Sequence, residues 1–510
     1  MGRSDSPRAI VVGGGQNGLS AAITLAERGW DTEVLEATNA LGGAVRSAEL
    51  TEPGFIHDVY SAVHPAAVSS PVFERWPLHR HGLRWVHPPV VMAHPLDDGS
   101  APALHRSVVA TSAALDEVAP GDGAGWEDFI SPYVARFDAM RRVMLAGFPP
   151  VVGGLRLVAA LRIGGVLEFA RLLLAPVAGL GRELFDHDAA RAWLYGSALH
   201  SDVGPLGSGS AIAAAYLKLM GHARGWPSPE GGAQRLTEAL AGHLHALGGR
   251  TRTEAQVVRV LGSGGRAVGV ELADGERIPA DVVIADLTAG RLGDVARDVL
   301  PSEMLAKLAR FRPGPGTFKV DWALDGPIPW TAQAARRAGT VHVGGAAGEI
   351  ARAVSEVELG NWPERPFLLA GQQSLADPSR APEGKHTAWA YTRTPGYGTA
   401  EDAERHTERV EAQIERFAPG FRDRIIARHV MAPADLERGN ANLEAGDVGG
   451  GSYTLDQVVF RPTPSLSPYR TGVRGLYLGS ASAFPGGAVH GVPGHAAAMA
   501  AHRDRQVRRV

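Results

Sequence analysis

The sequence contains no cysteine among its 510 residues. This absence excludes a disulfide framework, a thiol nucleophile, a redox dithiol and any thiolate metal site. An excess of basic residues is also missing, since 51 Lys and Arg face 54 Asp and Glu and give a net charge of −3. A general nucleic-acid-binding protein would carry a basic surplus. No uncharged apolar run reaches the roughly 18–20 residues of a membrane span, and no targeting segment is visible. We therefore expect a cytoplasmic protein without a nucleic-acid partner.

Glycine, in contrast, is abundant. The chain has 64 glycines, nearly twice the average share of about 7%, and many of them stand in clusters, which indicates backbone that approaches a ligand closely. The length is several times that of a typical single domain, so two or more lobes are expected. With 45% hydrophobic and 21% charged residues, the composition is that of a globular protein with a large core.

The N-terminus carries the clearest motif. Residues 9–12 form an apolar run typical of a buried parallel strand, and the sequence Gly-Gly-Gly-Gln-Asn-Gly follows at 13–18. A helical pattern covers 19–28, a second strand is predicted at 32–35, and Glu36 comes directly after it. A GxGxxG motif between strand and helix, with an acid about 20 residues further on, predicts a dinucleotide-binding βαβ unit. The alternative is a glycine-rich turn without a ligand.

Each residue type in this motif has a physical role. Gly13 permits the tight turn, Gly15 lets the backbone approach a pyrophosphate, and Gly18 lets helix and strand pack closely. The helix N-terminus offers free N–H groups to phosphates. Glu36 can accept hydrogen bonds from ribose hydroxyls. The expected contacts of this unit also include Gln16, Asn17 and Ala37.

A second glycine pair, Gly42-Gly43, stands shortly after Glu36 and is followed by Arg46. A plain nicotinamide-binding fold does not need this pair. The pair therefore indicates a second segment of backbone, in addition to residues 13–18, that lies close to the dinucleotide. Arg46 would then lie near a phosphate or a flavin. The alternative is an ordinary turn with a solvated arginine.

The middle of the chain is less informative. Residues 143–185 are apolar and helical in composition, and we expect breaks at Pro149-Pro150, Gly164-Gly165 and Pro176. Two interpretations stay open: helices packed around an apolar cavity, or a surface in peripheral contact with a membrane. Further on, a helix is predicted at 234–247, and strands at 257–272 and 281–285 indicate a return to the nucleotide-binding lobe. Residues 310–465 alternate strand-like runs with loops rich in Pro and Gly.

The C-terminus carries a second motif. A short strand at 475–478 leads into a loop rich in glycine and alanine at 479–494, and an alanine-rich helix at 495–505 follows. This unit repeats the anion-binding geometry of the N-terminal one. In a doubly wound sheet it can lie beside the first crevice, although about 460 residues separate the two.

Together these features resemble one family. Residues 13–18 with Glu36, residues 41–46 and residues 476–494 resemble the FAD-dependent phytoene desaturase-like oxidoreductases of the flavin amine-oxidase superfamily. Further motifs resemble the branch of pyridine nucleotide-disulfide oxidoreductase domain-containing protein 2; they are Asp456-Gln457, Arg461-Pro462, Tyr469-Arg470, residues 475–478 and Pro485-Gly486-Gly487, with Gly439-Asn440 and Gly446-Asp447. Without cysteine, a disulfide mechanism is impossible here.

The resemblance implies an α/β fold with a discontinuous, Rossmann-like FAD-binding domain and an inserted α+β substrate-binding domain. The FAD-binding domain would comprise residues 8–60, 226–300 and 466–510. The substrate-binding domain would comprise 61–225, with the apolar helical segment 143–185, and 301–465.

The resemblance also implies cofactor contacts. Val257 would contact adenine through its backbone, and the C-terminal loop would hold the flavin ring. This chain departs from the family pattern at Gly479-Ser480, where Cys-Gly is common, at Phe484, where His is usual, and at Ala488, where a third glycine is usual. The contacts expected from the loop are Gly479, Ser480, Gly487, Ala488 and Val489.

Two residues are candidates for catalysis. Lys319 stands in a strand-like run at 316–324; in flavin amine oxidases a lysine in a comparable strand reaches flavin N5 through a water molecule, but Lys319 could equally bond a carboxylate at the edge of a sheet. His490 could accept a proton or bond a substrate carbonyl, since histidine titrates near neutrality, or it could cap the loop. The remaining histidines show no ligand spacing, so we expect no metal site.

The leading hypothesis is an FAD-dependent oxidoreductase of desaturase, dehydrogenase or oxidase type. It would transfer a hydride from an apolar small molecule to flavin N5, and oxygen or a quinone would reoxidise the flavin. One alternative is an NAD-linked dehydrogenase, which leaves the C-terminal motif unexplained. Another is a flavin-containing scaffold or regulator with little turnover, which binds a protein or a membrane. The sequence leaves the oligomeric state open.

Overall fold

The N-terminal βαβ unit is present as predicted. In the computed structural model, which describes residues 6–507, β1 (Arg8–Val12) leads into α1 (Gln16–Ala26) and then into β2 (Asp31–Leu35). β1 and β2 pair in parallel. The apolar side chains of β1 are buried, as expected for a parallel strand with both sheet faces covered.

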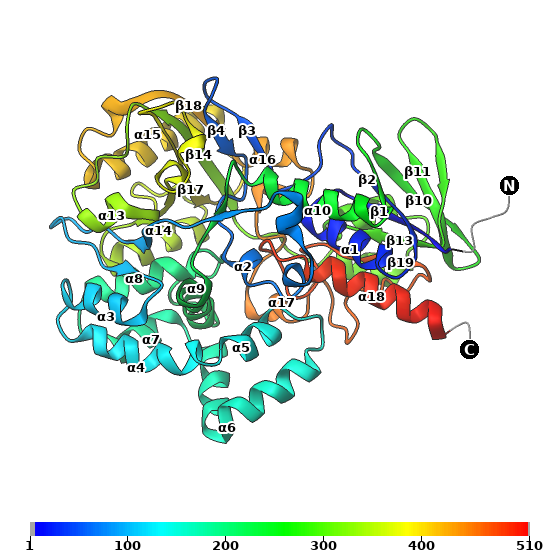
Figure 1. Ribbon diagram of the computed structural model, residues 1–510, viewed down its shortest axis with the longest axis horizontal. Coiled ribbons are helices and arrows are strands. Elements are labelled where there is room, and N and C mark those ends of the chain that lie inside the picture. Colours follow the sequence, from blue (N-terminus) through cyan, green and yellow to red (C-terminus); the bar gives the residue numbers. More distant parts are fainter. Residues whose placement is uncertain (1–5, 508–510) are drawn as a thin grey trace.

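Strands from distant parts of the chain complete this sheet. Its order is β19-β13-β1-β2-β9, and all its pairings are parallel. The added strands are β9 (Arg250–Arg252), β13 (Val282–Ala285) and β19 (Leu476–Leu478). On it, α1 packs against α10 (Gln234–Ala246) and α18 (Val492–Val507), and Figure 1 shows α18 beside α1. The predicted discontinuous, Rossmann-like α/β fold is confirmed.

A small antiparallel sheet adjoins this lobe. It consists of β10 (Val257–Ser263), β11 (Arg266–Leu272) and β12 (Arg277–Pro279) in that order. The predicted strands between 257 and 272 are therefore confirmed, with a glycine turn at Gly264-Gly265, where both φ values are positive.

The second lobe contains a seven-stranded mixed sheet, in the order β18-β14-β17-β16-β15-β6-β7. Two of its strands come from residues 61–225 and five from residues 301–465, so these two stretches build one α+β unit. The exact domain boundaries stay predictions. The strands are β6 (Val90–Ala93), β7 (Ala103–Leu104), β14 (Gly316–Leu324), β15 (Ala338–Val343), β16 (Leu368–Gly371), β17 (His386–Thr394) and β18 (Ile425–Met431).

Helices cover both faces of this sheet. α15 (Ala400–Phe417) packs its buried side chains against one face, whereas α8 (Asp188–Ala198), α9 (Ser210–Arg224) and α14 (Ala347–Glu358) pack against the other. α15 was not expected from the sequence. The remaining helices of the first insertion are α3 (Val108–Asp116), α4 (Asp122–Val134), α5 (Phe137–Met144), α6 (Val151–Leu174) and α7 (Val177–Leu184).

The segment 143–185 is helical, as predicted, but its breaks differ. α6 starts directly after Pro149-Pro150 and ends before Pro176, because proline lacks the N–H group that a helix interior needs. The break expected at Gly164-Gly165 is wrong, since α6 is continuous there. A glycine in a helix costs only about 1 kcal/mol relative to alanine, which packing elsewhere on the helix can offset.

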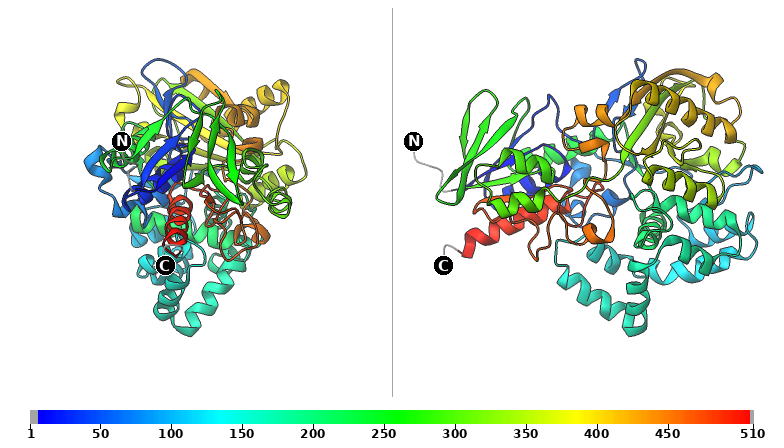
Figure 2. Two further views of the ribbon diagram at one scale, coloured as in Figure 1. Left: turned by 90° about the vertical axis from the view of Figure 1, so that its right-hand side faces the viewer. Right: turned by 180° about the vertical axis from the view of Figure 1, so that it is seen from behind.

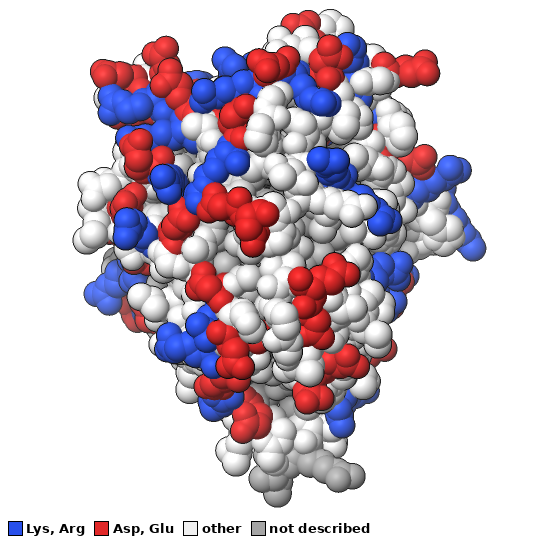
Figure 3. Space-filling model, turned by 90° about the vertical axis from the view of Figure 1, so that its left-hand side faces the viewer, with Lys and Arg blue, Asp and Glu red and all other residues white. Residues whose placement is uncertain are grey.

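α6 projects from the helical part of the molecule (Figure 2). Leu157, Phe169 and Leu172 are buried against neighbouring helices, while the opposite face presents apolar side chains to solvent. The exposed ones are Val151, Val152, Leu155, Val158, Leu167 and Leu174. In Figure 3 charges of both signs are spread over most of this face, including its lower half, and only the described residues at the lowest tip are without charge. Across residues 6–507, no helix combines the length and the apolar character needed to traverse a bilayer.

Candidate functional site

The glycine turn after β1 has the geometry that the motif predicts. Gly13 has a φ of +101°, a conformation that side chains disfavour. A Cβ on Gly18 would lie 2.0 Å from the carbonyl oxygen of Gly13, so helix and strand can approach this closely only without a side chain. A Cβ on Gly15 would lie 2.8 Å from a carboxylate oxygen of Asp286.

Glu36 closes this turn from the end of β2. Its carboxylate accepts hydrogen bonds from the backbone N of Gly14 at 2.8 Å and from N and Oγ1 of Thr38, both at 2.9 Å. A carboxylate can accept about four hydrogen bonds, so capacity is left for ribose hydroxyls. The buried position of Glu36 next to the glycine turn is the one expected for this role.

A cleft of about 310 Å³ lies beyond Glu36. Ala37 lines it, and Val257, the predicted adenine contact, begins β10 next to the lining residue Gln256. The backbone N of Ala255 donates to the carbonyl oxygen of Glu36 at 2.8 Å, so the small antiparallel sheet is held against the end of β2. The other lining residues are Asn39, Glu254, Leu272, Ala273 and Asp274.

The second glycine pair lies directly against the first turn. The backbone N of Gly42 donates to Gly14 at 2.9 Å, and a Cβ on Gly43 would lie 3.2 Å from the Cα of Gly15. Arg46 is half-buried near this pair. Among residues 6–507 no carboxylate lies within 4 Å of its guanidinium, which leaves the charge available for a phosphate or a flavin.

The C-terminal loop meets the N-terminal turn. The side chain of Gln16 accepts a hydrogen bond from the backbone N of Gly491 at 2.7 Å and donates to the carbonyl oxygen of Ala488 at 3.4 Å. A Cβ on Gly494 would lie 1.8 Å from the carbonyl oxygen of Asn17, so α1 and α18 touch through their backbones. The two motifs, far apart in sequence, therefore form one site.

Other residues of the C-terminal loop are fixed by neighbouring chain. The backbone N of Gly479 donates to Ala285 in the adjacent strand at 2.8 Å. Ser480 is buried and its hydroxyl accepts from the backbone N of Ser482 at 3.2 Å. Ala488 has a φ of +78°, so alanine stands here in a left-handed conformation that favours glycine. Gly487, Ala488 and the partly buried Val489 form the turn before α18.

His490 is buried within this loop. Its Nε2 donates to the carbonyl oxygen of Gly487 at 3.1 Å, and its Nδ1 accepts from the backbone N of Val492 at 3.2 Å. This pattern fits the neutral imidazole, and burial lowers the pKa of His490 to about 4. Both ring nitrogens thus serve the loop itself. A role in proton transfer to substrate stays a prediction, and it requires one nitrogen to leave its backbone partner.

Lys319 lies in β14 and is buried in an ionic cluster. Its ammonium group contacts the carboxylate of Asp321 and donates to the backbone carbonyl of Asp58 at 3.0 Å. The carboxylate of Asp58, in turn, is paired with Arg380. The contact with a carboxylate matches the structural alternative for Lys319, but β14 lies between β18 and β17 and not at the edge of the sheet. A water-mediated contact with a flavin stays a prediction.

Asp286, missed in the sequence, lies at the centre of the glycine turn. Its carboxylate accepts from the backbone N of Gly18 at 2.8 Å. Burial raises the pKa of Asp286 to about 7, although the Gly18 hydrogen bond opposes this shift. A signal did exist, since Asp286 directly follows the predicted strand 281–285, and carboxyl ends of parallel strands line ligand crevices.

The residues present fit a bound FAD molecule. The glycines form a cradle that side chains would fill, the start of α1 offers N–H groups, and the side-chain oxygen of Asn17 is buried without a partner. Among residues 6–507, no three His, Asp or Glu side chains are grouped to hold a metal ion.

Comparisons with known proteins agree with this geometry. Residues 109–501 match the family model "Flavin containing amine oxidoreductase", and residues 11–91 match "NAD(P)-binding Rossmann-like domain". Pyridine nucleotide-disulfide oxidoreductase domain-containing protein 2 of Mus musculus is 27% identical, over 97% of this chain and 93% of its own length. A phytoene desaturase (neurosporene-forming) of Cereibacter sphaeroides is 26% identical, over 98% and 94%.

Among solved structures, cyclohexylamine oxidase from Brevibacterium oxydans IH-35A superposes with a TM-score of 0.59 at 15% identity, covering 99% of this chain and 100% of that one. This similarity concerns the fold. The family match spans most of the chain and favours an FAD-dependent enzyme over the NAD-linked and scaffold alternatives. The chain belongs to the flavin containing amine oxidoreductase family and is a phytoene desaturase-like, FAD-dependent oxidoreductase.

Proposed function

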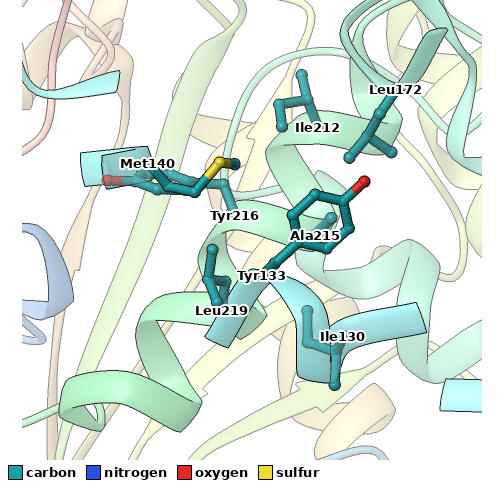
Figure 4. Close-up of a pocket in the computed structure, with 8 residues that line it drawn as sticks. All are labelled: Ile130, Tyr133, Met140, Leu172, Ile212, Ala215, Tyr216 and Leu219. Carbon is teal, nitrogen blue, oxygen red and sulfur yellow. The ribbon is translucent and has the colours of Figure 1, made fainter. Parts of the chain in front are cut away.

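We propose that this oxidoreductase takes a hydride from an apolar small molecule, with oxygen or a quinone as the final electron acceptor. One observation carries the proposal: where four helices of the substrate lobe meet, almost entirely apolar side chains surround a space of about 10 Å³, which must widen to admit a substrate (Figure 4). Its residues come from α4, α5, α6 and α9, and they are Ile130, Tyr133, Met140, Leu172, Ile212, Ala215, Tyr216 and Leu219. Related proteins named as phytoene and hydroxyneurosporene desaturases support the same substrate class.

This pocket is connected to the cofactor site by a short chain of contacts. Met140 lines the pocket, and the next residue, Arg141, donates to the backbone carbonyl of Ser69 at 3.2 Å. The hydroxyl of Ser70 donates to the carbonyl oxygen of His490 at 2.7 Å. α5, which lines the pocket, is thus linked through Ser69-Ser70 to the loop expected to hold the flavin.

The residues around the site orient and enclose rather than attack. FAD bound here would accept a hydride at N5 and pass two electrons on to oxygen or a quinone. A substrate C–H bond must then be aligned and kept from water, for which an apolar lining is suited. The neutral His490 holds the loop through Gly487 and Val492, and Lys319 stays paired with Asp321.

We also propose that α6 touches a membrane surface from which apolar substrate enters, with the protein otherwise in the cytoplasm. The exposed valines and leucines of α6 support this. Nearby, Arg142 and Arg156 are exposed and form no ion pair with a carboxylate of residues 6–507. Apolar side chains flanked by unpaired arginines favour an anionic lipid surface.

The substrate class is tested by anaerobic mixing of the purified holoenzyme with phytoene in detergent, decylamine or putrescine. We expect phytoene or decylamine to bleach the visible flavin absorbance, and putrescine to leave it unchanged. Air or a ubiquinone analogue, added afterwards, identifies the acceptor. Bleaching by putrescine alone would overturn the apolar substrate class.

Membrane contact is tested by co-sedimentation with phosphatidylglycerol and phosphatidylcholine vesicles. We expect wild type to bind the anionic vesicles and Leu155→Glu to bind several-fold less. Leu359→Glu is the matched control, because Leu359 is 79% exposed at the end of α14, away from α6. Equal binding of all three proteins would contradict a role for α6.

A further inference from the structure

Arg461 is a buried cation whose hydrogen bonds are incomplete. Its side chain is fully buried, and its Nη2 donates to the carbonyl oxygens of Gly450 at 2.5 Å and Gly451 at 3.2 Å. Nε and Nη1 have no partner in the structure. Because unpaired buried donors on a cation are costly, an acceptor or a negative charge is to be expected nearby.

No carboxylate of residues 6–507 lies within 4 Å of this guanidinium. Asp447 is close in the chain, but its two oxygens accept from the backbone N of Gly449 and of Gly451, both at 2.6 Å. Asp202 accepts from the backbone N of Tyr453 at 2.7 Å. Protein groups thus leave the charge of Arg461 without a direct counter-ion.

Two aromatic rings surround the cation instead. Its guanidinium carbon lies 4.9 Å from the ring centre of Tyr453 and 5.6 Å from that of Phe311. Such faces stabilise a cation without neutralising it. Arg380, by comparison, is equally buried but is paired with Asp58 and Asp377.

Arg461 stands directly behind the C-terminal loop. Its Nη1 lies 2.5 Å from where a Cβ on Gly486 would be, and the hydroxyl of Tyr453 lies 2.9 Å from the same position on Gly487. These residues lead into Ala488 and Val489, the contacts expected for the flavin ring. The unpaired charge therefore lies next to the part of the loop that is expected to hold the flavin ring.

We propose that Arg461 tunes bound FAD. The guanidinium of Arg461 supplies a positive charge that favours the negatively charged, reduced flavin ring. A reduced flavin carries its negative charge on the N1–C2=O side of the ring, and the protein's own charges tune that electronic state. In a buried site one charge within about 10 Å has a substantial effect, since the effective dielectric is only ~20. The reduction potential of the flavin rises as a result, whatever the substrate.

Sulfite is the probe for this charge. It adds to oxidised flavin when the sulfur lone pair forms a bond to N5, and the resulting negative charge moves to N1–C2=O, so no other reactant is needed. The sulfite Kd of the FAD-loaded wild type is compared with those of Arg461→Gln, Arg461→Lys and Arg474→Gln. Arg474 is the control for net charge, because it is exposed and bonds Gly264 in the small antiparallel sheet.

We expect Arg461→Gln to weaken sulfite binding roughly tenfold or more, the effect of one lost charge at this range. Arg461→Lys, whose buried ammonium gives up its proton more readily than a guanidinium, should fall between wild type and Arg461→Gln, and Arg474→Gln should not differ from wild type. The reduction potential, measured with redox dyes, should fall in the same order. Unchanged sulfite affinity and potential in flavin-loaded Arg461→Gln would overturn the proposal and leave a structural role for Arg461.

A second pair of variants applies if Arg461→Gln does not retain FAD. Phe311→Glu places a carboxylate beside the intact guanidinium, and Phe311→Gln is its uncharged control. We expect the Glu variant to bind sulfite roughly tenfold more weakly than the Gln variant, and equal affinities would overturn the proposal. Neither measurement uses a substrate, so their failure is distinguishable from failure of the proposed substrate class.

Discussion

The loops after β1 and after β19 occupy equivalent places, each between a parallel strand and a helix, but they are built differently. The first owes its shape to missing side chains, since a Cβ on Gly18 would collide with Gly13. The second combines close approaches of this kind, at Gly487 and Gly494, with side chains, since His490 bonds the loop backbone and Arg461 packs behind Gly486. A local motif therefore encodes most of the first loop, to which only Asp286 comes from far away, whereas the second is a local loop supported from behind by Arg461, which the motif does not include.

The largest expected effect concerns the first loop. Gly18→Ala places a Cβ 2.0 Å from the Gly13 carbonyl oxygen, so α1 must move away from β1. We expect a loss of about 3 kcal/mol or more in unfolding free energy and little bound FAD. Gly29→Ala is the control, because a Cβ on Gly29 would have nothing within 4 Å; the positive φ of Gly29, which Gly18 does not share, should alone cost only about 1 kcal/mol. Urea unfolding and flavin content measure both, and equal losses would contradict the close packing.

The next effect tests the second loop through pH. The pKa of buried His490 is lowered from 6.5 to about 4, so between these values the unfolded chain binds a proton that the folded protein does not. Stability from this group is complete above about pH 6.5 and is lost as the pH falls. Between about pH 7 and 5 wild type should lose about 2 kcal/mol more than His490→Gln.

Urea unfolding at both pH values gives this difference. The other buried histidines are present in both proteins and cancel. His79→Gln is the control, because His79 is exposed and its replacement should leave the pH dependence unchanged. If His490→Gln and wild type lose stability equally, His490 is not buried as the neutral ring.

A smaller effect is expected where the two loops meet. Gln16→Leu removes the acceptor for Gly491 and the donor to Ala488, and a buried N–H without a partner costs about 1–3 kcal/mol. We expect FAD to bind about tenfold more weakly, measured by quenching of FAD fluorescence in the apoprotein. Gln506→Leu, on an exposed residue near the end of α18, is the control. Unchanged FAD affinity in Gln16→Leu would mean that the loops bind independently.

The smallest effect concerns the one alanine of the second loop in a left-handed conformation. Ala488→Gly relieves the strain of a φ of +78° and should raise the unfolding free energy by about 0.5–1 kcal/mol. Ala481→Gly, in the same loop but without a positive φ, should lower it instead, because glycine gains more freedom in the unfolded chain. A loss of stability in both variants would show that Ala488 is not strained.

The same contrast explains how much could be predicted from sequence. The strands around Gly13 and Glu36 follow from local patterns, and so does the helix after Pro149-Pro150. The position of Arg461 could not be predicted, because Gly450 and Gly486, which contact it, come close to each other only in the folded protein. The contact of Lys319 with the backbone carbonyl of Asp58 likewise depends on a distant hairpin, β3 (Ser47–Glu49) with β4 (Ile56–Asp58), whereas its ion-pair partner Asp321 is local, two residues further along β14.

Two helical features were open to better prediction. α15 begins with a capping box in which Thr399 and Asp402 bond each other's backbone N–H groups, a sequence signature of a helix start. The glycine pair at 164–165 was given too much weight as a break, since flanking leucines and arginines favour helix. In both cases local propensity favours helix; for α15 the expectation of alternating strands and loops over 310–465 obscures it, and at 164–165 the glycine pair does.

The central claim is that both ends of the chain hold one FAD molecule, and a crystal structure of the holoprotein tests it most directly. We predict electron density for the pyrophosphate at the start of α1 beside Gly15 and Gly43, with the ring against residues 487–489. A dinucleotide confined to the N-terminal turn, or a flavin ring away from the loop that precedes α18, would contradict the claim.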